Sequence, residues 1–381
     1  MPETMLAIRK SRPEKGLWVE EVPRPRIEAD EVLVQVEAAS ICGTDLHIWK
    51  WDEWSQRRIR PPLTLGHEFA GTIVEVGDKV QQAKVGDYVS AESHVTCGMC
   101  YQCRTGQAHM CPNTKILGVD RNGAFAQFVA VPEKVIWQNN REKIPPEIAT
   151  LQEPFGNAVF ATMNQDVAGQ TVAVMGCGPI GLFTIGIAKA AGAAAVYACD
   201  LNEFRLNLAR QMGATQVFNV GARAGGISPD PVQMLVDANH GSGIDIILEM
   251  SGAPSAINIS FKAVRNGGRV ILFGIPSKPV EIDVAENMIF KNLTVLALNG
   301  RRIFDTWYKT RWLLEQGVVD LRPLVTKTIT LEEIGEAMEL LNRGEACKIV
   351  LLPNPTDSRP VAERVARRAQ DPNIKGAVVH R

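Results

Sequence analysis

QTVAVMGCGPIG, at residues 170–181, joins a short apolar run to a glycine-rich turn. The apolar run is typical of a strand buried in a parallel sheet. Residues 179–193 then have the apolar spacing of a helix. Gly176, Gly178 and Gly181 form G-x-G-x-x-G between the two, where they would permit a tight turn, a close backbone approach to a pyrophosphate and close helix packing. The stretch predicts a dinucleotide-binding unit, and an ordinary strand–turn–helix connection is the alternative.

Strands and helices continue to alternate beyond this stretch. Further strands are predicted at 195–200, 244–251 and 268–275, and helices at 202–214 and 255–264. Repeated alternation of this kind is typical of a doubly wound parallel sheet. We therefore expect a nucleotide-binding domain over residues 156–298.

An acidic residue ends the second predicted strand. Asp200 could accept hydrogen bonds from the ribose hydroxyls of the adenosine, and its charge would repel a 2′-phosphate. This position favours NAD over NADP. Arg205 lies five residues later and could support either cofactor.

The chain on either side of this domain has a different character. Segments 31–38, 70–77 and 87–92 alternate apolar and polar residues as half-buried strands do, and few long helical patterns precede residue 147. After residue 298 the pattern is mixed, with a helix expected at 305–317 and a strand at 348–353. We expect a β-rich catalytic domain over 1–155 that is completed by 299–353. Residues 354–381, rich in proline and arginine, are expected to form a mobile tail.

Composition narrows the class of protein. Of 381 residues, 45% are hydrophobic and 22% are charged, and the formal net charge is −1. This balance argues against a general attraction to nucleic acid or to an anionic membrane. No apolar run reaches the ~18–20 residues that a membrane span needs, and the N-terminus lacks the apolar core of a secretory signal. We expect a cytoplasmic enzyme.

Four of the eight cysteines lie within one short stretch, at Cys97, Cys100, Cys103 and Cys111. Such a cluster in a chain without an export signal favours metal binding over disulfides. Four thiolates suit tetrahedral Zn²⁺ and leave no position for substrate, so the ion would be structural. An iron–sulfur cluster is the competing interpretation.

A second, mixed set of metal ligands is more widely spaced. Cys42, His67 and Glu68 offer a thiolate, an imidazole and a carboxylate, which could hold a zinc ion and leave a place for a substrate oxygen. Such an ion would lower the pKa of an alcohol before its hydride passes to the nicotinamide. Thr44 and His47 are placed in sequence to carry the released proton to water. Glu153 is a candidate transient ligand or relay group, or a surface acid in an ion pair.

These motifs resemble the zinc-containing medium-chain dehydrogenases. The pattern Gly66-His67-Glu68-x2-Gly71-x5-Gly77-x2-Val80 is similar to the zinc signature of that family, and the cysteine loop and G-x-G-x-x-G follow in the same order. The resemblance covers about residues 5–353. It implies an α/β protein that combines a β-rich GroES-like catalytic domain with a Rossmann domain for NAD, and two zinc ions per chain.

Several further segments resemble members of the family that act on L-threonine. These segments are residues 41–56, 153–160, 200–213, 249–254 and 300–309. The resemblance implies oxidation of L-threonine to 2-amino-3-oxobutanoate with reduction of NAD. It also implies a homotetramer that acts in threonine breakdown, ahead of a CoA-dependent ligase.

The resemblance also assigns roles to individual residues. It implies that Cys42, His67 and Glu68 bind the catalytic zinc. It also implies that Thr44 and His47 form the proton relay, and that Glu153 is an acid important for catalysis. Positions that contact the cofactor are Ile180, Asp200, Arg205, Phe273, Gly274, Ile275, Leu298 and Asn299.

Two alternatives remain at this stage. The same zinc and NAD chemistry serves dehydrogenases of other polar secondary alcohols, such as polyols, sugar alcohols or 2,3-butanediol. A dinucleotide-binding protein without catalytic zinc belongs to a different class, and such proteins typically lack the cysteine and histidine ligands found here.

Overall fold

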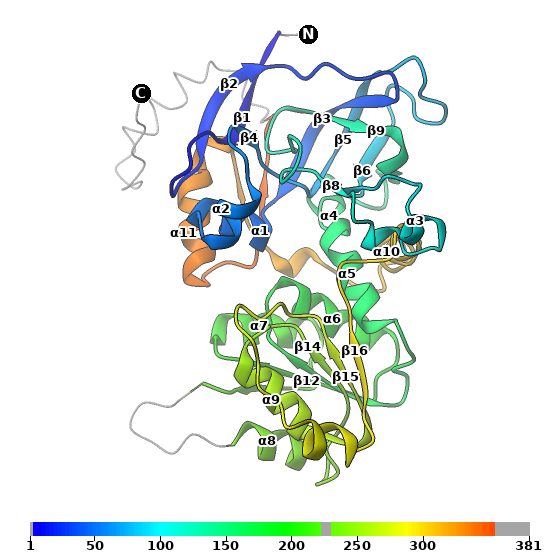
Figure 1. Ribbon diagram of the computed structural model, residues 1–381, viewed down its shortest axis with the longest axis vertical. Helices are drawn as coiled ribbons and strands as arrows, with labels where there is room; N and C mark the ends of the chain where they lie inside the picture. Colours follow the sequence, from blue (N-terminus) through cyan, green and yellow to red (C-terminus); the bar gives the residue numbers. More distant parts are fainter. Residues whose placement is uncertain (1–2, 222–229, 355–381) are drawn as a thin grey trace. The chain divides into compact units, whose positions relative to one another are not determined.

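The computed structural model describes residues 3–221 and 230–354, and the chain divides into two compact units (Figure 1). Unit 1 comprises Met1–Glu153 and Val325–Arg381, and unit 2 comprises Pro154–Leu324. The first boundary lies close to the predicted one at residues 155/156. The second differs from the predicted return at residue 299, because residues 299–324 belong to unit 2. The predicted tail lies, apart from Asn354, outside the described residues.

Unit 2 contains a six-stranded parallel sheet in the order β13-β12-β11-β14-β15-β16. The strands are β11 (Thr171–Met175), β12 (Ala195–Asp200), β13 (Gln216–Asn219), β14 (Ile244–Glu249), β15 (Val264–Leu272) and β16 (Thr294–Ala297). Renumbered from β11, this is the order 3-2-1-4-5-6 of the dinucleotide-binding fold. The doubly wound sheet predicted from the sequence is confirmed.

Helices cover both faces of this sheet (Figure 1). They are α6 (Pro179–Ala190), α7 (Glu203–Gln211), α8 (Pro231–Ala238) and α9 (Pro254–Ala263). Ala173 and Met175 of β11 share a buried cluster with Leu235 of α8 and Phe261 of α9. Val174 points to the opposite face, where a Cβ at Gly181 of α6 would lie 3.4 Å from it. Alternate residues of β11 therefore pack against different helices, as a sheet buried on both faces requires.

The segment after β16 stays with unit 2 for a packing reason. It contains α10 (Asp305–Glu315), and most of α5 (Gln152–Thr162) also belongs to this unit. A Cβ at Gly156 would lie 2.9 Å from the Arg301 side chain, and one at Gly186 would lie 3.0 Å from Val319. The absence of side chains at these glycines lets the returning chain lie directly on two helices of unit 2.

Unit 1 is built mainly from strands. A seven-stranded sheet has the order β10-β6-β5-β3-β18-β17 with β9 also paired to β3, and two smaller sheets have the orders β2-β1-β4 and β7-β8. The large sheet consists of β3 (Glu31–Ser40), β5 (Phe69–Val76), β6 (Tyr88–Ala91), β9 (Phe128–Pro132), β10 (Ile136–Gln138), β17 (Val325–Ile329) and β18 (Lys348–Leu351). The others are β1 (Thr4–Lys10), β2 (Trp18–Pro23), β4 (Leu63–Thr64), β7 (His94–Val95) and β8 (Lys115–Ile116). The β-rich character predicted for this part of the chain is confirmed.

The helices of unit 1 are short. They are α1 (Gly43–Lys50), α2 (Glu53–Arg58), α3 (Tyr101–Arg104), α4 (Pro146–Ala149) and α11 (Ile334–Arg343). Helix α1 contacts both α2 and α11, and the three lie together beside the strands (Figure 1). Strand β18 follows α11 and pairs with β3, which brings the end of the described chain into the large sheet.

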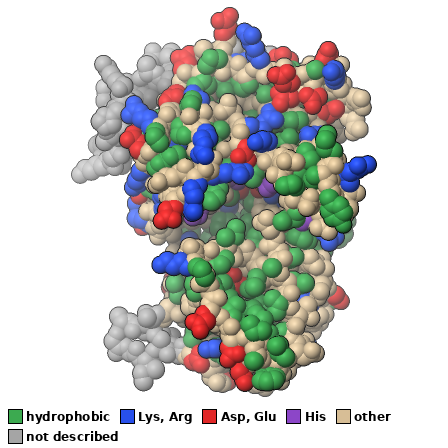
Figure 2. All heavy atoms as spheres, viewed as in Figure 1, with side chains coloured by type: hydrophobic (Ala, Val, Ile, Leu, Met, Phe, Trp, Pro, Cys, Tyr) green, Lys and Arg blue, Asp and Glu red, His purple; other side chains and the backbone are tan. Residues whose placement is uncertain are grey.

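The surface carries both signs of charge. Basic and acidic side chains are interspersed on the face shown in Figure 2. Among the helices that the structure describes, none has both the length and the apolar character needed to cross a bilayer.

Two glycines of the turn after β11 give a test of this packing. A Cβ at Gly181 would lie 1.9 Å from the Gly176 carbonyl oxygen, so Gly181→Ala must push α6 away from its strand. We expect a loss of about 1–3 kcal/mol in the free energy of unfolding. Thermal unfolding followed by circular dichroism would show a lower midpoint.

Gly178→Ala is the matched control for that prediction. A Cβ at Gly178 would meet no heavy atom within 4 Å, and its φ of −65° suits any residue. This variant should unfold at nearly the wild-type temperature. Equal midpoints for the Gly181→Ala and Gly178→Ala proteins would contradict the proposed packing of α6.

Candidate metal and cofactor sites

Cys42 lies where the chain passes from β3 into α1. It occupies the N-cap position of α1 with extended backbone angles (φ −102°, ψ 161°). The Cys42 N–H donates to Asp45 Oδ2 at 2.9 Å, and Asp45 is fully buried. This acid therefore holds the start of the helix and with it the direction of the Cys42 side chain.

His67 and Glu68 lie immediately before β5, next to the end of β3. One glycine shapes this entry: Gly66 has a φ of +93°, and a Cβ there would lie 2.2 Å from the Phe125 ring. His67 is 6% exposed and Glu68 is fully buried. Pairing of β3 with β5 places both residues beside Cys42, although 25 residues separate them in the chain.

The three predicted ligands come together. Their ligand atoms all lie within 4.8 Å of one another. Zinc bonds to such atoms are about 2.0–2.3 Å long, so one ion can reach all three after a small adjustment. His67 Nδ1 and Glu68 Oε1 are buried without a hydrogen-bond partner within the described ranges. This donor set, with buried polar atoms left unpaired, fits a zinc ion.

The electrostatics of the cluster also favour a cation. Burial alone would lower the pKa of His67, but the negative charges of Cys42, Asp45 and Glu153 raise it well above its usual value. Burial raises the pKa of Asp45 to about 6 against the opposing effect of His67. A cluster that draws protons in this way provides a favourable place for a divalent cation.

Two residues that sequence reasoning missed contact Glu68. Lys348 Nζ donates to Glu68 Oε2 at 2.5 Å, and the Ser40 hydroxyl donates to the same oxygen. Lys348 is 1% exposed and Ser40 is fully buried. No local pattern marks either residue, because the contact depends on β3, β5 and β18 being neighbours.

The predicted relay residues lie on α1. Thr44 Oγ1 is 3.9 Å from Cys42 Sγ, and His47 lies one turn further along with its side chain 61% exposed. His47 Nδ1 is 2.5 Å from Asp52 Oδ2, a partner that sequence reasoning missed. Burial opposes the shift, but hydrogen bonds from the Ser55 backbone and from His47 lower the pKa of Asp52. A charged acid therefore orients the imidazole.

Glu153 belongs to a small polar network. Near the start of α5 it is 5% exposed, and its Oε1 accepts from the Ser93 hydroxyl at 2.6 Å. His94 Nδ1 is 3.0 Å from Glu92 Oε1 and 3.0 Å from Ser93 Oγ. Ligand atoms of Glu92, His94 and Glu153 lie within 4.8 Å of one another. The structure thus places Glu153 in a largely buried polar group that includes three residues the sequence did not single out.

The four clustered cysteines converge on one point. Their sulfur atoms lie within 4.8 Å of one another, with Cys111 Sγ 3.5 Å from Cys97 Sγ and 3.7 Å from Cys100 Sγ. Zinc–sulfur bonds of about 2.3 Å in a tetrahedron place sulfurs about 3.8 Å apart. The backbone N–H groups of Met99 and Cys100 lower the pKa of Cys97 to about 6. All four cysteines are free thiols in the structure, and their spacing fits one zinc ion.

In unit 2 the glycine motif forms the predicted turn. Gly176 has a φ of +98°, and Gly178 is the N-cap of α6. Asp200 ends β12, where its Oδ2 accepts from the Cys177 N–H at 2.7 Å. The acid therefore supports the glycine-rich loop itself, and its contact with the ribose hydroxyls stays a prediction.

The other predicted cofactor positions follow different strands. Ile180 lies in the first turn of α6 and Arg205 in the first turn of α7. The remaining five follow the carboxyl ends of β15 and β16, at Phe273, Gly274, Ile275, Leu298 and Asn299. Because the strands are parallel, these loops share one edge of the sheet with the glycine turn. Ligands of this fold bind at that edge.

A buried acid that the sequence did not reveal organises part of this edge. Glu249 ends β14, and its Oε1 accepts from the backbone N–H groups of Ser251 and Gly252 at 2.9 and 3.0 Å. A Cβ at Gly274 would lie 2.0 Å from the Gly252 nitrogen. The loops after β14 and β15 are therefore packed backbone against backbone.

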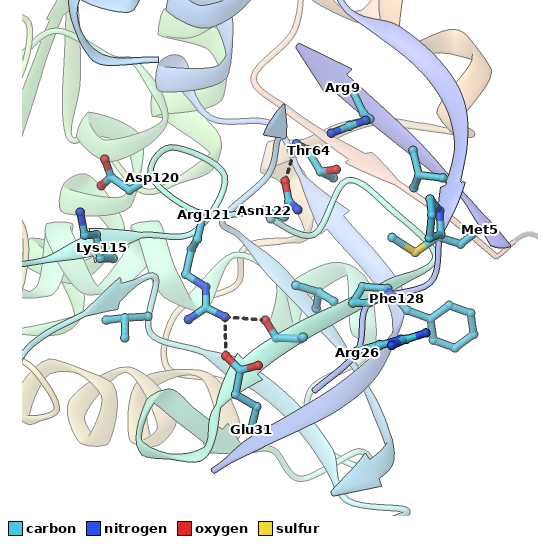
Figure 3. A pocket seen from close by; sticks show the side chains of 17 residues that line it. Met5, Arg9, Arg26, Glu31, Thr64, Lys115, Asp120, Arg121, Asn122 and Phe128 are labelled. Carbon is cyan, nitrogen blue, oxygen red and sulfur yellow. Dashed lines mark hydrogen bonds and ion pairs between the residues drawn. The ribbon is translucent and has the colours of Figure 1, made fainter. Parts of the chain in front are cut away.

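A cavity of about 660 Å³ in unit 1 is a separate feature (Figure 3). None of the predicted site residues lines it. Arg121 crosses one wall and donates to Glu31 Oε1 at 2.6 Å and to the Ala130 carbonyl at 3.2 Å, and Asn122 accepts from the Thr64 N–H. The charged side chains in the wall of the cavity are thus partly paired, and Cys42, His67 and Glu68 do not line the cavity.

Comparisons with known proteins agree with this geometry. Residues 28–141 match the model of the alcohol dehydrogenase GroES-like domain, and residues 179–316 match that of the zinc-binding dehydrogenases. The L-threonine 3-dehydrogenase of Symbiobacterium thermophilum is 49% identical over 355 residues, which are 93% of this chain and 99% of the relative.

Solved structures give the same result. An Escherichia coli alcohol dehydrogenase complexed with NADH has a TM-score of 0.82 and 28% identity, covering 92% of this chain and 100% of the other. The 2R,3R-butanediol dehydrogenase of Bacillus subtilis has a TM-score of 0.81 and 29% identity, with the same coverage. This chain therefore belongs to the zinc-containing medium-chain alcohol dehydrogenase family.

Proposed function

We propose that this enzyme oxidises the 3-hydroxyl of L-threonine to 2-amino-3-oxobutanoate and transfers the hydride to NAD. The observation that carries the proposal is the cluster of half-buried Cys42 with buried His67 and Glu68. It occurs in a chain that is 49% identical to an L-threonine 3-dehydrogenase over nearly the full length of both proteins. A dehydrogenase of another polar secondary alcohol is the second candidate, supported by the likeness to a butanediol dehydrogenase structure.

Cys42, His67 and Glu68 would hold the catalytic zinc. Zinc bound there acts as a Lewis acid that lowers the pKa of the substrate hydroxyl. Asp45 fixes the backbone of Cys42, and burial of His67 and Glu68 limits the access of bulk water to these two ligands. Glu153, held by the Ser93 hydroxyl, would add negative charge beside the cluster.

Thr44 and His47 would carry the released proton. The Thr44 hydroxyl lies beside Cys42, which supports a role for it in accepting a proton from the substrate. It would pass a proton on to the His47 imidazole. His47 is exposed and can release the proton to water. Asp52 would hold the imidazole in one orientation and stabilise its charged form.

The sheet edge of unit 2 would hold NAD. The turn from Gly176 to Gly181 would receive the pyrophosphate at the N-terminus of α6, where free N–H groups face an anion. Asp200 would accept from the ribose hydroxyls. The loops after β15 and β16 would contact the nicotinamide half of the cofactor.

The four-cysteine loop would hold a second zinc with a structural role, which makes two ions per chain. The sulfur–sulfur distances of 3.5 and 3.7 Å support a single ion. An iron–sulfur cluster would hold the sulfurs farther apart, because its own iron and sulfide atoms lie between them.

The proposal extends to the setting of the enzyme. It would act in the cytoplasm as a homotetramer in threonine breakdown. A CoA-dependent ligase would consume the 2-amino-3-oxobutanoate.

Initial rates with L-threonine, sorbitol and 2,3-butanediol, each with NAD, test the substrate. We expect kcat/KM to be highest for L-threonine. A higher kcat/KM for either of the other alcohols would reject threonine and leave the second candidate.

Replacing one ligand of each metal cluster separates the two proposed zinc sites. Cys42→Ser should lose about one zinc per chain and nearly all turnover, while NAD still binds. Cys103→Ser should also lose about one zinc, but it should lower the unfolding temperature because a structural ion contributes folding energy. Metal analysis, NAD titration and thermal unfolding measure these effects. Wild-type zinc content and turnover in Cys42→Ser would refute the catalytic site.

Asp200→Asn tests the choice of cofactor. Removing the charge should lessen repulsion of the 2′-phosphate, and the ratio of kcat/KM for NAD to that for NADP should fall at least about tenfold, or about 1.4 kcal/mol. Glu203→Gln, a nearby change in the first turn of α7, should leave the ratio unchanged. An unaltered ratio in Asp200→Asn would show that this carboxylate does not set the preference.

A further inference from the structure

The two oxygens of the Glu68 carboxylate have different surroundings. Oε2 receives hydrogen bonds from Lys348 Nζ and from the Ser40 hydroxyl. Oε1 is buried and receives none within the described chain. The same carboxyl group therefore has one occupied oxygen and one available oxygen.

The donors to Oε2 are held rigidly. Ser40 ends β3 and Lys348 begins β18, and these strands pair with each other while β3 also pairs with β5. The Ser40 N–H donates to the Glu68 carbonyl at 3.0 Å, and Lys348 Nζ also donates to the Ile41 carbonyl at 2.8 Å. Rotation of the carboxylate would break these contacts in a dry interior, where an unpaired ammonium is costly.

Lys348 also balances the charge of the cluster. Glu68, Asp45 and Glu153 are acids with at most 5% exposure, and Cys42 would be a thiolate with zinc bound. Lys348 is the cation that contacts this group in the described structure, with Glu68 as its salt-bridge partner. Lys348 Nζ thus occupies Glu68 Oε2, the oxygen that a metal ion would otherwise share with Oε1.

We infer that Lys348 and Ser40 are positioning residues that make Glu68 a one-oxygen ligand of the catalytic metal. The inference rests on the proposed function of the Cys42 cluster. With Oε2 occupied, Glu68 offers only Oε1, and a coordination position remains for the substrate hydroxyl. Without the lysine, the carboxylate would be free to chelate with both oxygens and to crowd the substrate position, so an ion that also binds water or substrate would have five ligands in place of four.

Cobalt substitution tests this directly, because Co²⁺ d–d absorption weakens as the coordination number rises above four. Lys348→Met keeps the length of the side chain and removes its donors. In this variant we expect weaker d–d bands from the Cys42 site at unchanged cobalt content, and kcat for L-threonine about 10–100-fold lower. Ser40→Ala, which keeps the lysine, should show a smaller weakening of the bands, and the Kd for NAD should not change in either variant.

Cys42→Ser retains the four-cysteine site. Its cobalt spectrum is therefore subtracted from that of each other protein, which leaves the bands of the Cys42 site alone. Lys10→Met is the matched control, because Lys10 is also fully buried in unit 1 but bonds to the Gly16 carbonyl, away from the cluster. Its bands should equal those of the wild type.

The outcomes separate the inference from the proposed function. Wild-type band intensity in folded Lys348→Met, or in Ser40→Ala if the lysine variant does not fold, would overturn the inference alone. If wild-type and Cys42→Ser proteins gave the same spectrum, no metal would bind at the Cys42 cluster, and the proposed function would fail with it.

Discussion

Burial of several charged groups in one small volume is the constraint on which the metal-binding unit depends. Asp45 and Glu68 are fully buried and Lys348 is 1% exposed. Such groups remain in a protein interior only when each has a partner of fixed geometry. The Asp45 carboxylate accepts from the Cys42 backbone, and Glu68 pairs with Lys348, so the ligand positions follow from the way the interior satisfies its charges.

Strand pairing provides that geometry. Strand β3 pairs with β5 on one side and with β18 on the other. Cys42 follows β3, His67 and Glu68 precede β5, and Lys348 begins β18. Three distant parts of the chain therefore meet at one end of a sheet, and small shifts of a ligand would disturb backbone hydrogen bonds as well as side-chain contacts.

In unit 2, contacts of the backbone, and not ion pairs between buried side chains, order the edge of the sheet. At its sheet edge, Gly181 lets α6 approach the Gly176 carbonyl, and Gly274 lets two loops pack together. Two buried acids, Asp200 and Glu249, accept from the backbone N–H groups of these loops. The edge that would hold NAD is therefore ordered by main-chain contacts, which suits the recognition of a cofactor shared by many enzymes.

Much of the fold could be predicted because its signals are local. The alternation of strands and helices from residue 170 onward, and the half-buried strands before it, follow from apolar periodicity within each element. The end of unit 2 at Leu324 could not be placed, because the packing of Arg301 against Gly156 and of Val319 against Gly186 joins residues far apart in the chain.

The sequence by itself determined which ligand chemistry is present: a thiol, an imidazole and a carboxylate in one group, four thiols in another, and a glycine turn with an acid. These are properties of residue type and spacing. Only the tertiary structure decided which partners contact the functional side chains. Lys348 contacts Glu68, Asp52 contacts His47, and the pair of Glu92 and His94 lies beside Glu153. The Lys348–Glu68 contact spans 280 positions and arises from strand order, a long-range property that no local pattern records.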